Sequence, residues 1–119
     1  MNKATPNKLF DYAKLLKKSG LKLYILSNQM KFRADYIKTH FDIRFFNKAF
    51  FSNELGFMKP DKKIYNYVLK QIKFKPNECL FIDDKIDNIE SAKSLGINTI
   101  QFKSVNQVKK DLDKFGVKI

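Results

Sequence analysis

The chain has 119 residues, of which 44% are hydrophobic and 30% charged, a composition typical of one globular domain. No apolar run reaches the roughly 18 residues needed to span a bilayer, and the N-terminus has no signal-peptide pattern, so we expect neither a membrane protein nor a secreted one. The single cysteine, Cys79, cannot form an internal disulfide, which favours the reducing cytoplasm.

The formal net charge of +12 raises the question of a nucleic-acid partner. The lysines are scattered along every predicted helix, and only short pairs occur, such as Lys17-Lys18 and Lys109-Lys110. This distribution is typical of solvated helix faces, with an overall field that favours anionic ligands. We therefore predict a small anionic substrate and argue against nucleic-acid binding.

The first part of the chain predicts a helix followed by a strand. Thr5-Pro6 supplies a hydroxyl cap and a proline at the first helical position, and Ser19-Gly20 ends the run of helically spaced apolar residues. The apolar stretch from Leu21 to Leu26 is too short for a helix and is closed by Ser27-Asn28. It therefore predicts a buried strand.

The middle of the chain predicts a second helix, a second strand and a third helix. The second helix covers about Phe32 to Thr39, and the second strand covers Lys48 to Ser52. Residues 53–56 are expected to lead out of this strand as a loop. An amphipathic pattern over Asp61 to Lys73 then predicts the third helix.

The last part of the chain repeats the alternation. Cys79 to Ile82 predicts a buried strand, Ile89 to Leu95 a helix, Ile97 to Phe102 the last strand and Val105 to Phe115 the last helix. Strands that alternate with helices of about ten residues indicate crossover units and a parallel sheet covered on both faces. We predict one domain over residues 1–119 with a three-layer, Rossmann-like α/β fold.

Polar residues follow three of the predicted elements at places where α/β sheets bind ligands, the carboxyl ends of the strands. Ser27-Asn28 ends the first strand, Lys59 lies in the loop after the second, and Asp83-Asp84 ends the third. Each has a structural alternative: a helix cap for the first, a solvated lysine for the second, and charge held by a helix N-terminus for the third.

Taken together, these residues favour phosphoryl transfer. Adjacent carboxylates repel each other, and a Mg²⁺ ion shared with phosphate and water is a common way to offset that repulsion. A hydroxyl and backbone amides suit phosphate oxygens, and a lysine suits the charge that develops on them. The group that would attack phosphorus is missing from this set.

Three segments resemble motifs of the haloacid dehalogenase-like (HAD) superfamily, in the order that the family shows. Residues 23–28 resemble the second motif, an apolar strand that ends in Ser or Thr. Residues 54–65 are similar to the third motif, which contains Lys59, and residues 80–97 to the fourth, which contains Asp83-Asp84. The spacing resembles small sugar phosphatases and the phosphatase domain of soluble epoxide hydrolases.

The resemblance implies a role for each matching residue. Ser27 and the amide of Asn28 would bind the transferring phosphoryl group, and Lys59 would offset its charge. Asp84 and Asp83 would hold Mg²⁺. Two further residues would act without touching the phosphoryl group or the Mg²⁺ ion. Asn88 would act through water, and Asp87 would cap its helix or orient Lys59.

The chain also departs from the family pattern. The family begins with a central strand that ends in Asp-x-Asp, the first aspartate being the nucleophile, and no such motif lies upstream of Ser27. In the family that strand lies between those that here end at Ser27 and Asp83. The cap that usually selects the substrate is absent as well. The expected fold is thus a HAD core truncated at its N-terminal side, and the substrate class, a small sugar or metabolite phosphate, is implied by resemblance alone.

Three hypotheses follow from the missing nucleophile. The chain is an inactive fragment of a phosphatase, or a separate N-terminal polypeptide supplies the strand and the nucleophile, or the chain is a non-enzymatic phosphate-binding or protein-interaction module. Without the central strand, its two neighbours would either keep unpaired edges or pair with each other. Dimerisation through the gap would be one way to cover such edges.

Overall fold

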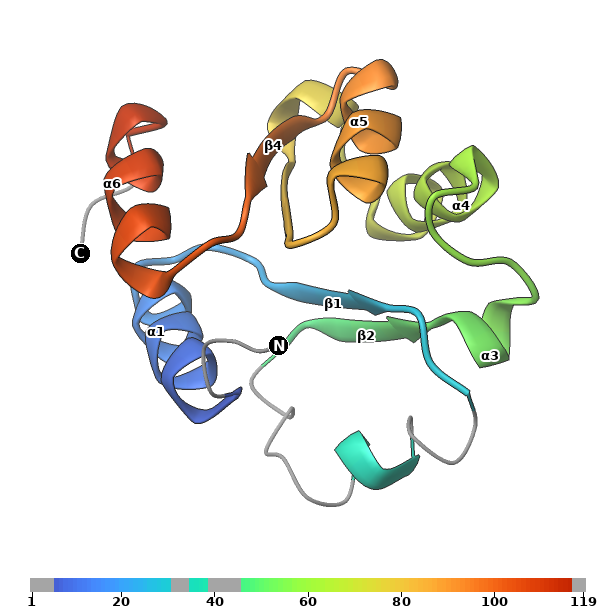
Figure 1. Ribbon diagram of the computed structural model, residues 1–119, viewed down its shortest axis with the longest axis horizontal. Helices are drawn as coiled ribbons and strands as arrows, with labels where there is room; N and C mark the ends of the chain where they lie inside the picture. Colours follow the sequence, from blue (N-terminus) through green and yellow to red (C-terminus); the bar gives the residue numbers. More distant parts are fainter. Residues whose placement is uncertain (1–5, 31–34, 39–45, 117–119) are drawn as a thin grey trace.

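The computed structural model describes residues 6–30, 35–38 and 46–116 (Figure 1). Strands and helices alternate along it as predicted. The helix expected over residues 32–39 lies largely outside the described residues, and residues 35–38 are helical. The elements are α1 (Pro6–Lys18), β1 (Tyr24–Ser27), β2 (Lys48–Phe51), α3 (Ser52–Leu55), α4 (Lys62–Ile72), the 3-10 turn η1 (Pro76–Glu78), β3 (Leu80–Asp83), α5 (Ile86–Ser94), β4 (Asn98–Gln101) and α6 (Val105–Lys114).

The loop predicted for residues 53–56 is wrong, because this segment belongs largely to the short helix α3. Gly56 ends α3 with a φ of 83°, and its N–H donates to the Ser52 carbonyl oxygen at 3.1 Å. Glycine adopts such a positive φ without the clash that a side chain would cause. A four-residue helix has no apolar periodicity, so hydrophobic spacing could not predict it.

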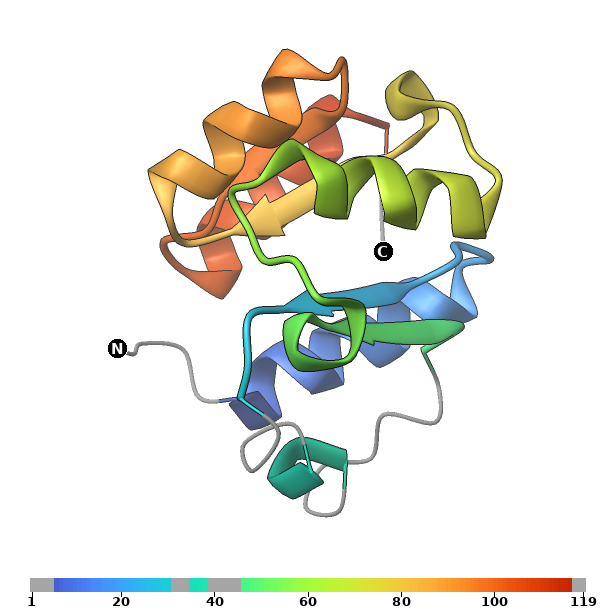
Figure 2. The ribbon, with the colours of Figure 1, turned by 90° about the vertical axis from the view of Figure 1, so that its right-hand side faces the viewer.

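The four strands in the described residues form two parallel pairs where the sequence predicts one sheet. β1 pairs with β2, with Tyr24 opposite Lys48, and β3 pairs with β4, with Leu80 opposite Asn98. Figure 2 shows β1 and β2 side by side, with β3 separated from them. Within the described residues no strand lies between β1 and β3. Of the two outcomes considered for a missing central strand, the structure has the unpaired edges.

Helices cover both faces of the strands and complete the three layers. On one face α1 and α6 contribute to a core cluster, whose buried residues are Tyr12, Leu16, Ile100, Val108 and Leu112. On the other face α4 and α5 contribute to a second cluster, whose buried residues are Ile64, Tyr65, Ala92 and Ile97. Leu80 and Ile82 pack against the first cluster and Phe81 against the second, as the two-residue repeat of a strand requires.

Side chains next to the unpaired edges join the two strand pairs. Leu23, which precedes β1, packs against the same cluster as Leu80 of β3. Leu26 of β1 packs against the same cluster as Phe81 of β3. Apolar contacts above and below the strands therefore hold together two pairs that no backbone hydrogen bond connects in the described part. None of the described helices is long and apolar enough to cross a membrane.

Candidate functional site

Lys59 joins the carboxyl ends of β1 and β3. It lies in the segment between α3 and α4, and its Nζ donates to the Leu26 carbonyl oxygen at 3.2 Å and to Asp83 Oδ2 at 2.5 Å. The Lys59 and Asp83 side chains are only 9% and 7% exposed. Two of the residues predicted to meet at the edge of the sheet thus form a buried ion pair, and this pair bridges the two strand pairs.

The carboxylate of Asp83 has partners at both oxygens. Oδ1 accepts from the Lys85 backbone N–H at 2.9 Å, and Oδ2 accepts from Asn88 Nδ2 at 3.2 Å as well as from Lys59. Burial by itself would raise the pKa of Asp83, but the Lys59 ammonium and the hydrogen bonds from Lys59 and from the Lys85 backbone outweigh it and hold the pKa below its usual value. Asp83 therefore stays ionised and neutralises Lys59.

Asp84, the other predicted metal ligand, is exposed just beyond the end of β3. Its carboxylate is the better of the two for a hard divalent cation, because both oxygens of Asp83 already have donors. No group of three or more His, Cys, Asp or Glu side chains in the described part is arranged to hold a metal ion. Asp84 thus offers one free carboxylate to a Mg²⁺ ion, and the role of Asp83 as a second ligand stays a prediction. The remaining ligands would have to come from substrate, water or another segment.

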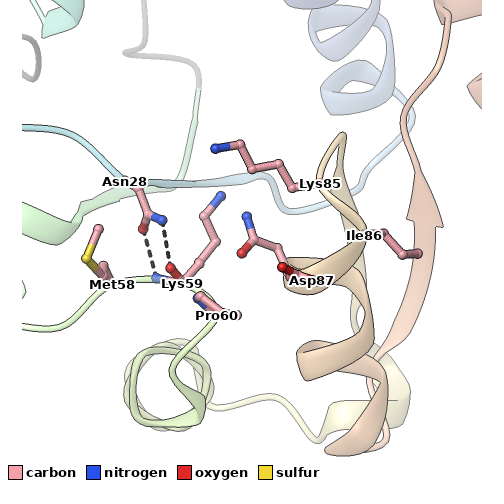
Figure 3. A pocket seen from close by; sticks show the side chains of 8 residues that line it. Asn28, Met58, Lys59, Pro60, Lys85, Ile86 and Asp87 are labelled. Carbon is pink, nitrogen blue, oxygen red and sulfur yellow. Dashed lines mark hydrogen bonds between the residues drawn. The ribbon is translucent and has the colours of Figure 1, made fainter.

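The backbone of Lys59 is held from both sides. Its N–H donates to Asn28 Oδ1 at 2.8 Å, and its carbonyl oxygen accepts from Asn28 Nδ2 at 2.9 Å (Figure 3). The next carbonyl oxygen, of Pro60, accepts from Ser91 Oγ of α5 at 2.5 Å. The segment that contains Lys59 is thereby fixed to the end of β1 and to α5.

Ser27 is the last residue of β1 and is partly buried. Its Oγ accepts a hydrogen bond from Gln29 Nε2 at 2.7 Å. The position next to Asn28 agrees with a hydroxyl at the carboxyl end of a strand, as the sequence predicts. The phosphate-binding role of this hydroxyl remains a prediction.

A cavity of about 470 Å³ opens beside these residues (Figure 3). Of the predicted residues, four line the cavity, whereas Ser27, Asp83 and Asp84 are not among its lining residues. The lining consists of Asn28, Met58, Lys59, Pro60, Lys85, Ile86, Asp87 and Asn88.

Asn88 and Asp87 differ in what they contact. Asn88 is 4% exposed, and its side chain bonds directly to Asp83, which in turn holds Lys59. Asp87 lies exposed in the first turn of α5, where its negative charge favours the helix N-terminus. Asn88 therefore acts on Lys59 only through Asp83, and the roles predicted for Asp87 stay predictions.

Two residues without a predicted role also support the site. Tyr65 is 2% exposed, its hydroxyl donates to the Asn88 carbonyl oxygen at 3.0 Å, and its ring packs edge-on against Phe81. Burial, together with the charge of Asp83, raises the pKa of Tyr65, which therefore stays a neutral donor. A buried tyrosine hydroxyl needs a partner, which is the sequence signal that could have pointed to Tyr65. Ser91 gave no comparable signal.

The family comparison agrees with the resemblance of the motifs. The model of the haloacid dehalogenase-like hydrolases matches residues 4–96. Among curated proteins, the chain is 30% identical over 112 residues to the bifunctional epoxide hydrolase 2 of Rattus norvegicus, covering 86% of this chain and 19% of that protein. It is 32% identical over 83 residues to the sesquiterpene phosphatase astK of Aspergillus oryzae, covering 69% of this chain and 42% of that protein.

Solved structures share the fold. A HAD family enzyme of Bacteroides thetaiotaomicron, solved in complex with magnesium and inorganic phosphate, superposes with a TM-score of 0.73 at 28% identity. The match covers 81% of this chain and 53% of that one. The chain therefore spans well under two thirds of the length of each of these three proteins.

Proposed function

Because the chain belongs to the haloacid dehalogenase-like hydrolases, we propose that it forms part of a Mg²⁺-dependent phosphohydrolase acting on a small phosphate monoester. The observation that carries this proposal is the position of Lys59. Its ammonium lies between the carboxyl ends of β1 and β3, within hydrogen-bonding distance of both. A fixed positive charge at this edge of a parallel sheet suits a phosphoryl group.

Each predicted residue has a task in this proposal. The Ser27 hydroxyl and the Asn28 backbone amide would donate to phosphoryl oxygens, and Lys59 would offset the charge that develops on them. Asp84 would hold Mg²⁺ together with Asp83, and the ion, when bound, would supply further positive charge at the phosphate. Asn88 would keep Asp83 in place through their hydrogen bond.

The nucleophile would come from a segment outside the described residues. No Asp-x-Asp lies upstream of Ser27 in the sequence. The unpaired edges of β1 and β3 support a partner segment that enters as a parallel strand and carries an aspartate at its carboxyl end. The segment would belong to an N-terminal part of the same phosphatase, of which residues 1–119 would be the C-terminal part, or to a separate complementing polypeptide. Residues 1–119 alone would not turn over substrate.

The names of the relatives support the substrate class. One is a sesquiterpene phosphatase and another, from Bacteroides thetaiotaomicron, a D-ribitol-5-phosphate phosphatase. Both names describe the hydrolysis of a phosphorylated metabolite, so we place the same class of substrate, in the cytoplasm, with this chain.

Hydrolysis of p-nitrophenyl phosphate tests the proposal. We expect no turnover by the chain alone and Mg²⁺-dependent turnover after co-expression with a polypeptide that contains an apolar strand ending in Asp-x-Asp. Lys59→Met in the complemented protein should lower kcat by about 100-fold or more. Turnover that is unchanged by Lys59→Met would contradict the assignment of the site.

The second candidate function is a non-enzymatic phosphate-binding or protein-interaction module, and the position of the Lys59 ammonium between the ends of β1 and β3 favours phosphate binding here as well. It shares the phosphate contacts of Ser27, Asn28 and Lys59. The two candidates differ in one outcome, because the module would bind phosphate but show no turnover with any added strand.

A further inference from the structure

The Asn28 side chain makes two hydrogen bonds to the backbone of Lys59, of the kind that a neighbouring strand makes in a sheet. A carboxamide carries both a donor and an acceptor, and here they meet the carbonyl oxygen and the N–H of the same residue at 2.9 and 2.8 Å (Figure 3). Serine, aspartate or threonine could not supply both groups with this planar geometry. The pair of bonds therefore depends on the amide itself.

Lys59 needs such support because it lies outside any helix or strand. Residues 56–61, between α3 and α4, have no regular hydrogen-bonding ladder, and Lys59 is only 9% exposed. Buried backbone groups without partners are costly, so the N–H and C=O of Lys59 require the bonds that Asn28 makes. These two hydrogen bonds, the Asn28 clamp, thus determine where the backbone of Lys59 lies.

Asn28 directly follows Ser27, the last residue of β1. A side chain that fixes the Lys59 backbone to residue 28 also sets the spacing between the Ser27 hydroxyl and the Lys59 ammonium. The two groups come from different elements, and the proposed reaction requires both on the same phosphate. Asp83 fixes only the ammonium end of Lys59 and would not set this spacing.

We propose that the Asn28 side chain is a positioning residue, which holds Lys59 at the correct distance from Ser27 for phosphate binding. The inference rests on the proposed function. It adds a role for the side chain of Asn28 to that of its backbone amide, and the side chain acts entirely through Lys59.

A double-mutant cycle on phosphate binding tests this role. The affinity of the purified chain for inorganic phosphate with Mg²⁺ is measured for the wild type, Asn28→Ala, Lys59→Met and the double variant. We expect Asn28→Ala to weaken binding about tenfold in the wild type, as loss of hydrogen-bonding support to a binding residue does. In the Lys59→Met background the same change should alter affinity by less than about twofold.

Asn47→Ala is the matched control. Asn47 Oδ1 also accepts from a backbone N–H, that of Leu23, at 2.8 Å, and from Lys17 Nζ at 2.7 Å, with neither contact at the cavity. This variant should leave phosphate affinity unchanged. An equal loss in Asn28→Ala and Asn47→Ala would point to general destabilisation and overturn the inference.

Amide hydrogen exchange gives a second reading that needs neither phosphate nor the Lys59→Met variant. In Asn28→Ala the Lys59 amide should exchange about tenfold faster, because it loses its acceptor, while the Asp61 amide, bonded to the Met58 carbonyl oxygen at 2.9 Å, should keep its rate. Unchanged exchange at Lys59 would overturn the inference. Equal phosphate affinity in the wild type and Asn28→Ala would also overturn the inference, but it would leave the proposed function intact. Absence of phosphate binding by the wild type would contradict both.

Discussion

At the scale of single residues, the pair of Lys59 and Asp83 dominates the site. Both side chains are almost completely buried, so each depends on the other to offset the loss of hydration. Removing one partner leaves an uncompensated charge, whereas an exposed pair contributes little. The ion pair is therefore a structural element as well as the proposed source of positive charge.

Lys59→Met should destabilise the chain by about 3–5 kcal/mol, because it leaves the Asp83 carboxylate buried without its counter-ion. Lys114→Met removes an exposed partner, whose Nζ lies 3.8 Å from Asp111 and whose side chain is 78% exposed. It should cost less than about 1 kcal/mol. Urea unfolding of the two variants measures the difference, and similar losses in both would contradict the burial of the Lys59 pair.

The pH dependence of stability should change sign between the wild type and Lys59→Met. In the wild type the pKa of Asp83 is lowered, so its contribution is present above the unfolded value of about 3.9 and is lost as pH falls below it. In Lys59→Met, burial is the largest influence left and should raise that pKa. The variant should then lose stability as pH rises above about 4, which thermal unfolding between pH 3 and 7 would show.

The sequence predicted which residues lie near the site better than it predicted their contacts. Ser27, Lys59 and Asp83 could be placed because strand ends converge in a parallel sheet. The Asn28 clamp and the contact of Asn88 with Asp83 could not, because each joins residues that are brought together only by tertiary packing. Tyr65 was missed because it lies beside the apolar stripe of its helix, where spacing alone gives no hint of a buried hydroxyl.

At the scale of elements, the unpaired edges of β1 and β3 are the main feature. The Leu23 carbonyl oxygen accepts from Asn47 N–H of the neighbouring segment, and the Cys79 carbonyl oxygen accepts from Asn98 N–H. The backbone N–H and C=O groups of successive strand residues point to opposite sides of the strand. Those of Leu26, three residues after Leu23, should therefore point to the unpaired edge. Its carbonyl oxygen indeed accepts from Lys59 Nζ.

Hydrogen exchange should therefore alternate along both strands. The amides of Ile25 and Phe81 lie on the paired edges and should be protected, whereas those of Leu26 and Ile82 lie on the free edges and should exchange faster. A complementing strand should slow exchange at Leu26 and Ile82 and leave Ile25 and Phe81 unaffected. Equal protection at all four amides of the isolated chain would contradict the unpaired edges.

Local signals were sufficient to predict most elements. The apolar runs that became β1 and β3 and the amphipathic pattern that became α4 are properties of short segments, and the structure confirms them. The division of the strands into two pairs depends on which segments are available to fill the sheet, and it could be predicted only as one of two outcomes. The helix α3 was missed because it is too short to show a period.

At the scale of the whole molecule, two strand pairs share apolar clusters on both faces and are bridged by Lys59. Within the described residues, this arrangement keeps Ser27, Lys59 and the Asp83-Asp84 pair at one edge without a strand between them. The proposed function depends on that edge, because all the groups assigned to phosphate and Mg²⁺ are contributed there. In the proposed function, the missing strand would add the nucleophile to this edge.

The most direct test is a titration of the isotope-labelled chain with inorganic phosphate and Mg²⁺, followed by the backbone amide signals in NMR spectra. We expect saturable shifts at Ser27, Asn28 and Lys59, and shifts at Asp84 that require Mg²⁺. The Lys59→Met variant should lose them. Weak, non-saturating shifts spread over the exposed lysines, with none at Ser27 or Lys59, would contradict the claim that this edge of the sheet is a phosphate site.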